Sequence, residues 1–144
     1  MVKAKDFLSY LCEKRDYRYF AGVVCPGLLP LYDNMSSEFM HYIPVVNERV
    51  AIGMAIGASV AGLKSSVLFG DYGVFDIIKF KTIFYNIYRK SFLSIIHTDN
   101  IQIGKELKHY GLDFFILDKN FEKKFKEDSI IIVRSGVFEW LDIW

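Results

Sequence analysis

Residues 45–58 read VVNERVAIGMAIGA and predict the passage from a buried strand into a helix. The β-branched Val45 and Val46 are typical of a strand, and Glu48 stands in the first turn of the segment that follows. Alanine and glycine recur through this helix, predicted over residues 48–61, and their small side chains let it approach a neighbouring backbone closely. Taken alone, Glu48 has a simple electrostatic interpretation, because acidic residues favour the positive end of the helix dipole.

Strand-like and helical segments alternate on both sides of this stretch. Such alternation predicts an α/β fold, with an open parallel sheet and helices on both of its faces. In sheets of this kind, ligands bind beyond the carboxyl ends of the strands. Strands are expected at 19–24, 40–46, 65–69, 92–97, 113–117 and 129–133, and helices at 6–14, 28–35, 48–61, 74–89, 103–110 and 121–126.

The composition fits one domain and excludes several kinds of partner. The 144 residues predict a single domain, with a core over about 6–134 and a C-terminal tail at 135–144. Lys and Arg number 18 against 17 Asp and Glu, so no basic excess favours nucleic acid. No apolar run approaches the roughly 20 residues that span a bilayer, which argues against a membrane protein. The N-terminus lacks the apolar stretch of a signal peptide, and Cys12 and Cys25 are expected to be reduced thiols of a cytoplasmic protein.

The motif E-R-x-A-x-G-x-A-x-G-A-x-x-A-G, which begins at Glu48, resembles the signature of the pyrimidine-binding domain of thiamine-diphosphate-dependent decarboxylases. The resemblance is strongest to the α subunit of sulfopyruvate decarboxylase and to phosphonopyruvate decarboxylase, and it covers most of residues 6–134. Only this motif is specific, since the other matching segments are ordinary α/β segments in the right order. These segments are residues 21–29, 62–68, 92–97 and 105–115.

The resemblance implies a catalytic role for Glu48. In the family, the matching glutamate hydrogen-bonds N1′ of the cofactor's aminopyrimidine, and the cofactor then acts as an electron sink for a 2-keto acid. A carboxylate does this well when it is sheltered from water and its pKa is raised, and the apolar residues beside Glu48 predict such shelter. The resemblance implies that the cofactor-binding residues are Glu48, Pro26, Gly27, Asp71, Tyr72 and Gly73.

The chain departs from the family where the substrate would bind. The family's Q-N-S-G-x-G-N loop becomes residues 69–76 here, so its amides and hydroxyl are replaced at most in part by Asp71 and Tyr72. The strand that ends in S-H-R-G in the family keeps its histidine as His97 but lacks the arginine. His97 and Cys25, both at strand ends, are the candidates for substrate contact. A nucleophilic role for Cys25 competes with that of an ordinary thiol, because the sequence places no base beside it.

The resemblance also implies a partner. Thiamine diphosphate needs a second domain, whose Gly-Asp-Gly motif and downstream Asn hold Mg²⁺ and the diphosphate. Residues 70–73 read Gly-Asp-Tyr-Gly, so an extra residue splits that motif, and no metal site is predicted in this chain. We therefore expect a diphosphate-binding partner subunit, a homo-oligomer, or both, with Glu48 across a subunit interface from the Mg²⁺ site.

Three functions remain open from the sequence. The leading one is the pyrimidine-binding subunit of a split decarboxylase that acts on a small anionic 2-keto acid such as sulfopyruvate or phosphonopyruvate. The second is a non-catalytic relative that serves in binding or assembly, and the third is a subunit of another thiamine-diphosphate transferase. Two segments bear on assembly. The aromatic residues 82–88 fit either a core helix or an interface, and the tail with Trp140 and Trp144 is expected to dock on a partner or on the domain's own sheet.

Overall fold

The computed structural model describes residues 1–35 and 40–139, which form an α/β domain around a six-stranded, all-parallel sheet. The strand order is β2-β1-β3-β4-β6-β5, with every neighbouring pair parallel. This arrangement confirms the predicted fold class. The strands are β1 (Tyr19–Gly22), β2 (His41–Pro44), β3 (Ser65–Phe69), β4 (Leu93–His97), β5 (Phe114–Ile116) and β6 (Ile130–Val133).

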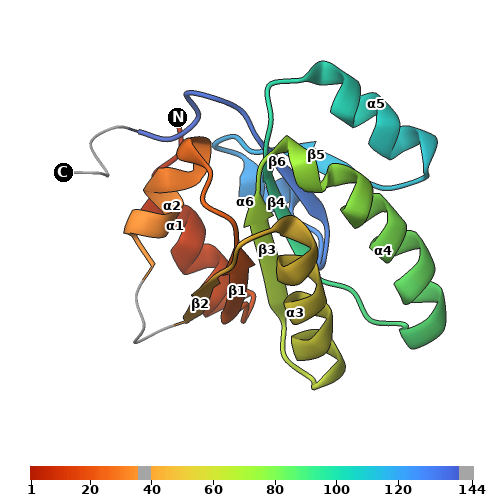
Figure 1. Cartoon of the computed structure of the whole chain (residues 1–144). Helices are drawn as coiled ribbons and strands as arrows, with labels where there is room; N and C mark the ends of the chain where they lie inside the picture. The colour runs from red at the N-terminus through yellow and green to blue at the C-terminus, as the bar shows by residue number, and fades with distance from the viewer. Residues whose placement is uncertain (36–39, 140–144) are drawn as a thin grey trace.

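Helices cover both faces of the sheet (Figure 1). Helices α3, α4 and α5 lie on one face, and α1, α2 and α6 lie on the other. Short 3₁₀ turns at Pro26–Leu28 and Asp71–Gly73 lead into α2 and α4, and a π-helical segment at Tyr10–Lys14 continues α1. The helices are α1 (Ala4–Ser9), α2 (Leu29–Asp33), α3 (Glu48–Val60), α4 (Val74–Tyr88), α5 (Ile101–His109) and α6 (Phe121–Lys124).

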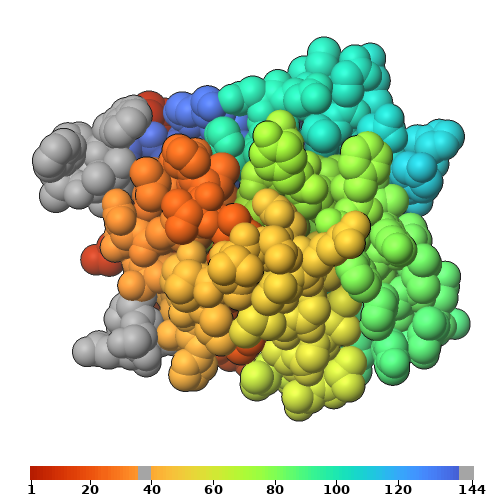
Figure 2. Space-filling view, viewed as in Figure 1, coloured from red at the N-terminus to blue at the C-terminus, as the bar shows by residue number. Residues whose placement is uncertain are grey.

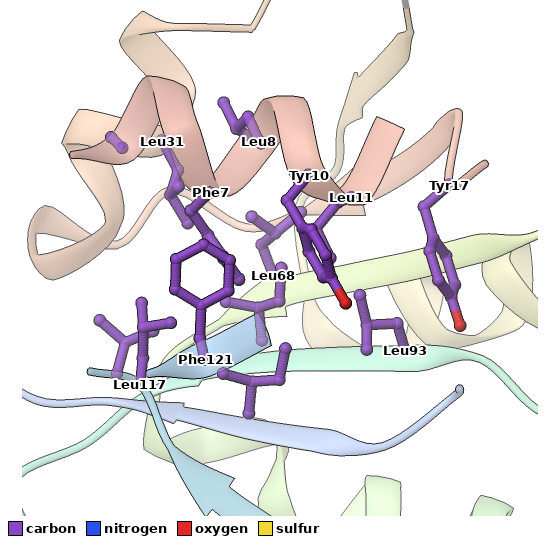
Figure 3. Packing of buried hydrophobic residues seen from close by; sticks show 14 of the residues in the cluster. Phe7, Leu8, Tyr10, Leu11, Tyr17, Leu31, Leu68, Leu93, Leu117 and Phe121 are labelled. Atoms are coloured by element: carbon purple, nitrogen blue, oxygen red, sulfur yellow. The ribbon is translucent and has the colours of Figure 1, made fainter. Parts of the chain in front are cut away.

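Two apolar layers, one on each side of the sheet, form the core. Successive residues of β3 point into opposite layers, so Leu68 packs with the α1 side while Val67 packs with the α3 side. Figure 3 shows the first layer, where the rings of Phe7 and Phe121 meet edge to face with centroids 5.3 Å apart. Because both faces are covered, the central strands are mostly apolar, in keeping with the 52% hydrophobic content.

The order of the strands reverses twice, and these reversals position the site. The chain passes from β1 to β2 at one edge and returns across β1 to β3. Later it passes from β4 to β5 at the other edge and returns to insert β6 between them. Ligand-binding crevices form at such reversals, beyond the carboxyl ends of the strands.

The two ends of the described chain meet beside the sheet. The Val2 amide donates to the carbonyl of Val137 at 2.8 Å, and the Glu139 amide donates to the carbonyl of Val2 at 3.0 Å. Phe138 is buried in the α1-side layer, so the segment after β6 packs on this domain up to Glu139. The two tail tryptophans lie outside the described residues. In the part of the chain that the structure describes, no helix is long and apolar enough to cross a membrane.

Candidate functional site

The carboxyl ends of β1, β3 and β4 bring together residues that are far apart in the sequence. A Cβ atom placed on Gly70 would lie 3.4 Å from Cys25 Sγ and 3.8 Å from the carbonyl oxygen of His97. A Cβ atom placed on Gly27 would lie only 2.1 Å from Cδ2 of His97, so the imidazole ring rests directly on this glycine. The two candidates for substrate contact, Cys25 and His97, thus lie close together at the carboxyl end of the sheet.

A hydrogen-bond chain ties His97 to the segment that follows β6. His97 Nε2 lies 3.1 Å from Ser135 Oγ, and the Ser135 hydroxyl in turn bonds to Oδ2 of Asp99. The backbone N–H of Ser135 donates to Oδ1 of the same carboxylate at 2.9 Å. The side-chain and backbone hydrogen bonds from Ser135, with the charge of Arg134 acting in the same direction, hold the pKa of Asp99 below its usual range.

A cavity of about 200 Å³ opens beside this chain, between the start of α2 and the segment after β6. Its wall is mostly apolar, with the Arg134 side chain as its charged group. Arg134 Nη1 donates to the carbonyl of Thr98 at 3.1 Å, which anchors the guanidinium at the end of β4. The lining residues are Pro26, Gly27, Leu29, Pro30, Arg134, Ser135, Gly136 and Phe138.

Glu48 begins α3, as predicted, but it does not cap the helix. The side chain of Asn47 performs that role, because its Oδ1 accepts the backbone N–H of Val50 at 3.0 Å. Within residues 1–35 and 40–139, the Glu48 carboxylate has no hydrogen bond and no ion pair. It is half-buried, yet Val46 is 89% exposed and Val50 41% exposed. Val46 and Val50 therefore give Glu48 little shelter, whereas Ile52 is fully buried and Val45 is partly buried.

The other residues predicted to bind the cofactor fall into two groups. Pro26 and Gly27 line the cavity described above. Asp71 and Tyr72 lie in an exposed 3₁₀ turn, and Tyr72 is 90% exposed. Gly73 has a packing role, because a Cβ atom there would lie 2.2 Å from the ring of Phe69. The structure therefore does not bring all of these residues into one cavity.

The surroundings of Cys25 favour a protonated thiol over an activated nucleophile. Burial raises its pKa, and this outweighs the backbone N–H groups of Gly27 and Leu28, which act in the opposite direction. The charge of Asp71 raises the pKa further. Because the thiolate is the reactive form, the environment favours the interpretation of Cys25 as an ordinary thiol.

Sequence reasoning did not identify Asp99, Arg134 or Ser135. The last strand was predicted, but its insertion beside β4 follows from the strand order, which the pattern of apolar residues does not contain. Once β6 pairs with β4, with His97 opposite Val133, Arg134 necessarily follows at the same edge. Arg134, directly after β6, thus brings a guanidinium to the backbone of Thr98, the residue after His97. The sequence offered one sign of this role for Arg134, namely its position directly after a predicted strand.

The comparisons with known proteins agree with this architecture. Residues 2–109 match the model of a family described as "Thiamine pyrophosphate enzyme, N-terminal TPP binding domain". A similar solved structure is 2-oxoglutarate:ferredoxin oxidoreductase from Magnetococcus marinus, with 2-oxoglutarate, coenzyme A and succinyl-CoA bound. The TM-score is 0.65 at 12% identity, over 94% of this chain and 29% of that chain, so the likeness shows the fold alone and this chain spans under a third of that protein. No curated protein matches. The family match covers well over half of the sequence, and the chain therefore belongs to the family of N-terminal, cofactor-binding domains of thiamine pyrophosphate enzymes.

Proposed function

We propose that this chain is the pyrimidine-binding subunit of a split thiamine-diphosphate-dependent decarboxylase that acts on a small anionic 2-keto acid, such as sulfopyruvate or phosphonopyruvate. The observation that carries the proposal is the free carboxylate of Glu48 at the start of α3. When bound, the cofactor supplies an electron sink for decarboxylation. Glu48 would hold a proton between its carboxyl group and N1′ of the aminopyrimidine, because a carboxyl group both accepts and donates.

The geometry at Glu48 fits this task. Asn47 satisfies the end of the helix, so the Glu48 carboxylate is not committed to a structural bond. The neighbouring Arg49 pairs instead with Asp76 on α4, at 3.2 Å, and so leaves Glu48 without a competing cation. A carboxylate that is free of intramolecular partners is available to a ring nitrogen of a ligand.

A partner subunit is the second part of the proposal, and the exposed face of α3 supports it. Small and apolar residues recur along this face at intervals of three and four, so they form one stripe that begins beside Glu48. Cβ atoms placed on its two glycines would meet nothing within 4 Å, which leaves room for the backbone of another chain. Figure 2 shows α3 uncovered at the front of the molecule. The stripe consists of Val50, Gly53, Gly57 and Val60, and the exposed Val46 precedes the helix.

The subunit that covers this stripe would carry the Mg²⁺ and diphosphate sites, or it would be a second copy of this chain. Its contact would exclude water from Glu48, which Val46 and Val50 do not do within this chain. Exclusion of water strengthens a hydrogen bond between a carboxyl group and a cofactor. In this proposal, the partner subunit completes a shelter that the neighbours of Glu48 provide only in part.

The substrate would bind at the carboxyl end of the sheet, where Cys25, His97 and the cavity lie. Arg134 offers N–H donors beyond the one given to Thr98, and a guanidinium matches the geometry of a carboxylate. His97, which is hydrogen-bonded to the adjacent Ser135, supplies a second polar group at this end of the sheet. A small 2-keto acid with an anionic end fits these two groups.

Glu48→Gln tests the catalytic part. The variant keeps the size of the side chain but cannot transfer a proton, so we expect decarboxylation to fall about 10²–10⁴-fold. The assay uses the chain co-purified with its partner, with 2-keto acids in the presence and absence of thiamine diphosphate. Glu106→Gln, an exposed glutamate on α5, is the matched control. Near-normal turnover by Glu48→Gln would remove Glu48 from the mechanism.

The second candidate is a non-catalytic domain that keeps the fold and its association surface. It is favoured by the turn at Asp71–Gly73, where one residue is needed for packing and Tyr72 faces solvent. The same assembled preparation separates the candidates. Binding of the cofactor without turnover of any 2-keto acid would support the non-catalytic role, whereas group transfer to a second carbonyl would indicate another thiamine-diphosphate reaction.

A further inference from the structure

We propose that Asp99 and Ser135 are positioning residues, which hold the neutral His97 ring with its proton on Nε2 and leave Nδ1 as the free ring nitrogen. The use of this arrangement in catalysis rests on the proposed function. The arrangement itself is a property of this chain and is measured without cofactor or partner.

The direction of the hydrogen bonds follows from the single proton of the Ser135 hydroxyl. A hydroxyl donates one hydrogen bond and accepts others. Oδ2 of Asp99 can only accept, because its pKa is held below the usual range and the carboxylate is ionised at neutral pH. The hydroxyl proton therefore goes to Asp99. At 3.1 Å from the same oxygen, His97 Nε2 must be the donor, and it carries the ring proton.

The direction of these hydrogen bonds is fixed further because both oxygens of the Asp99 carboxylate accept hydrogen bonds from Ser135. Oδ1 accepts the backbone N–H of Ser135 at 2.9 Å, which turns Oδ2 toward the hydroxyl. The carbonyl of the intervening Thr98 is held in turn by Arg134 at 3.1 Å. The loop after β4 and the loop after β6 are thus joined by these hydrogen bonds, and the donor and the acceptor of each bond are known.

The ring is fixed in orientation as well as in tautomer. A Cβ atom on Gly27 would lie 2.1 Å from Cδ2, 2.2 Å from Nε2 and 2.4 Å from Cγ of His97, so this part of the ring covers the glycine. Nδ1 is not among these nearest atoms. No other hydrogen bond of the ring is found in the described part of the chain. Nδ1 is therefore the nitrogen left for a ligand.

This assignment deepens the proposed function, because it states what His97 offers to the substrate. The neutral ring presents a lone pair at Nδ1 that accepts a proton or a hydrogen bond. The protonated ring donates from the same atom to an anionic group. If His97 lines the substrate site, Nδ1 is the atom through which it exchanges a proton with the 2-keto acid.

Asp99→Asn provides a test with a distinctive outcome. The amide oxygen must keep the backbone N–H of Ser135, so the NH₂ group takes the place of Oδ2 and donates to the hydroxyl. The hydroxyl then has to donate to Nε2, and the ring proton moves to Nδ1. Long-range ¹H–¹⁵N spectra of the full chain, recorded at alkaline pH where imidazole is neutral, distinguish the two tautomers directly. We expect the Nε2–H form in the wild type and the Nδ1–H form in Asp99→Asn.

The controls separate positioning from general disturbance. Asp118→Asn changes another exposed carboxylate that accepts a backbone N–H, from Asn120 at 2.8 Å, and should leave His97 in the Nε2–H form. Ser135→Thr keeps the hydroxyl and should also keep that form. Substitutions of His41 and His109 by Gln assign the His97 signals. An Nδ1–H form in the wild type, or an unchanged tautomer in folded Asp99→Asn, would overturn the proposal. Because no cofactor takes part, a failure of the decarboxylase assignment leaves this result intact.

Discussion

Gly27 determines where the His97 ring can lie, and its role is steric. In Gly27→Ala, the added methyl group would lie 2.1 Å from the ring, so the ring must leave its place beside Ser135. We expect the free energy of unfolding to fall by about 1–3 kcal/mol, as in other overpacked sites, and the His97 resonances to shift. Urea unfolding and the spectra described above measure the two effects.

Gly57→Ala is the matched control for this residue. It also adds one methyl group, but a Cβ atom at Gly57 meets nothing within 4 Å. In a helix interior the change should stabilise the isolated chain by about 0.5–1 kcal/mol, because alanine restricts the unfolded state more than glycine does. If Gly27→Ala and Gly57→Ala had the same free energy of unfolding, a methyl group at residue 27 would not clash with the His97 ring.

Single residues also show where sequence reasoning reaches its limit. The position of Glu48 at the start of a helix was predictable, because the apolar pattern and the family motif are local. The packing of Gly27 on His97 was not, since it depends on how β1 and β4 are placed in the sheet. Asp99 and Ser135 were missed for the same reason. They are 36 residues apart, and only the pairing of β4 with β6 brings them together.

At the scale of elements, α3 has a buried face and a bare one. Ala51, Ile52 and Ala55 pack on the sheet, while the stripe that begins at Val50 faces outward. The sequence predicted a helix over 48–61, and the structure has it over Glu48–Val60. The abundance of small residues was interpreted as a means of close approach to a neighbouring backbone. Within the described chain, no neighbouring backbone lies against Gly53 or Gly57. The single chain therefore makes no use of the close approach that these glycines allow.

Gly53→Leu tests whether another subunit uses this face. The side chain would project into open space, so the isolated chain should keep its fold and lose no stability. Association with the partner subunit, measured by co-purification and analytical ultracentrifugation, should weaken at least tenfold, because the leucine fills space needed by the partner's backbone. Glu106→Leu places the same side chain on the exposed surface of α5 as a control. Unchanged association of Gly53→Leu would show that the partner binds elsewhere.

The second half of α4 differs from a core helix. The rings of Phe80, Phe84 and Tyr88 follow one another along the helix, with centroids 5.0 and 5.6 Å apart. On its outer side Ile83 is 49% exposed and Ile87 is 65% exposed. The sequence left a core helix and an interface as alternatives for residues 82–88. The exposure of these large side chains favours the interface, because small domains seldom leave such groups uncovered.

At the scale of the whole molecule, the two ends of the sheet have different roles. The carboxyl end carries the candidate site, and the amino end carries a buried lysine that joins three elements. Lys81 of α4 donates to Ser91 Oγ at 3.2 Å and to the carbonyl of Phe92, both just before β4. It also donates to the carbonyl of Asp128, before β6, at 2.7 Å. These bonds fix α4 against the sheet, and Lys81 takes no part in the proposed chemistry.

Lys81 should make the stability of the domain depend on pH. Burial lowers its pKa to about 7, and the charge of Asp128 offsets this only in part. In the unfolded chain the pKa returns to about 10.4, so between these values the unfolded state binds more protons than the folded state. The free energy of unfolding therefore rises with pH, by roughly 2 kcal/mol from pH 7 to pH 9. From about pH 8.5 upward the raised pKa of Cys12, about 11, acts in the opposite direction, because the unfolded thiol loses its proton there while the folded one keeps it.

Lys81→Met tests whether the titration of Lys81 causes the rise in the free energy of unfolding with pH. The methionine fills similar volume but leaves the carbonyls of Phe92 and Asp128 without a donor, so at pH 9 the variant should be about 1–3 kcal/mol less stable than the wild type. Its stability should no longer rise between pH 7 and pH 9. Lys79→Met, an exposed lysine of the same helix, should keep the wild-type profile. Urea unfolding at pH 7, 8 and 9 measures all three proteins. A wild type whose stability does not rise over this range, or a Lys81→Met profile that rises as steeply, would mean that Lys81 stays charged in the folded core, held by its three acceptors.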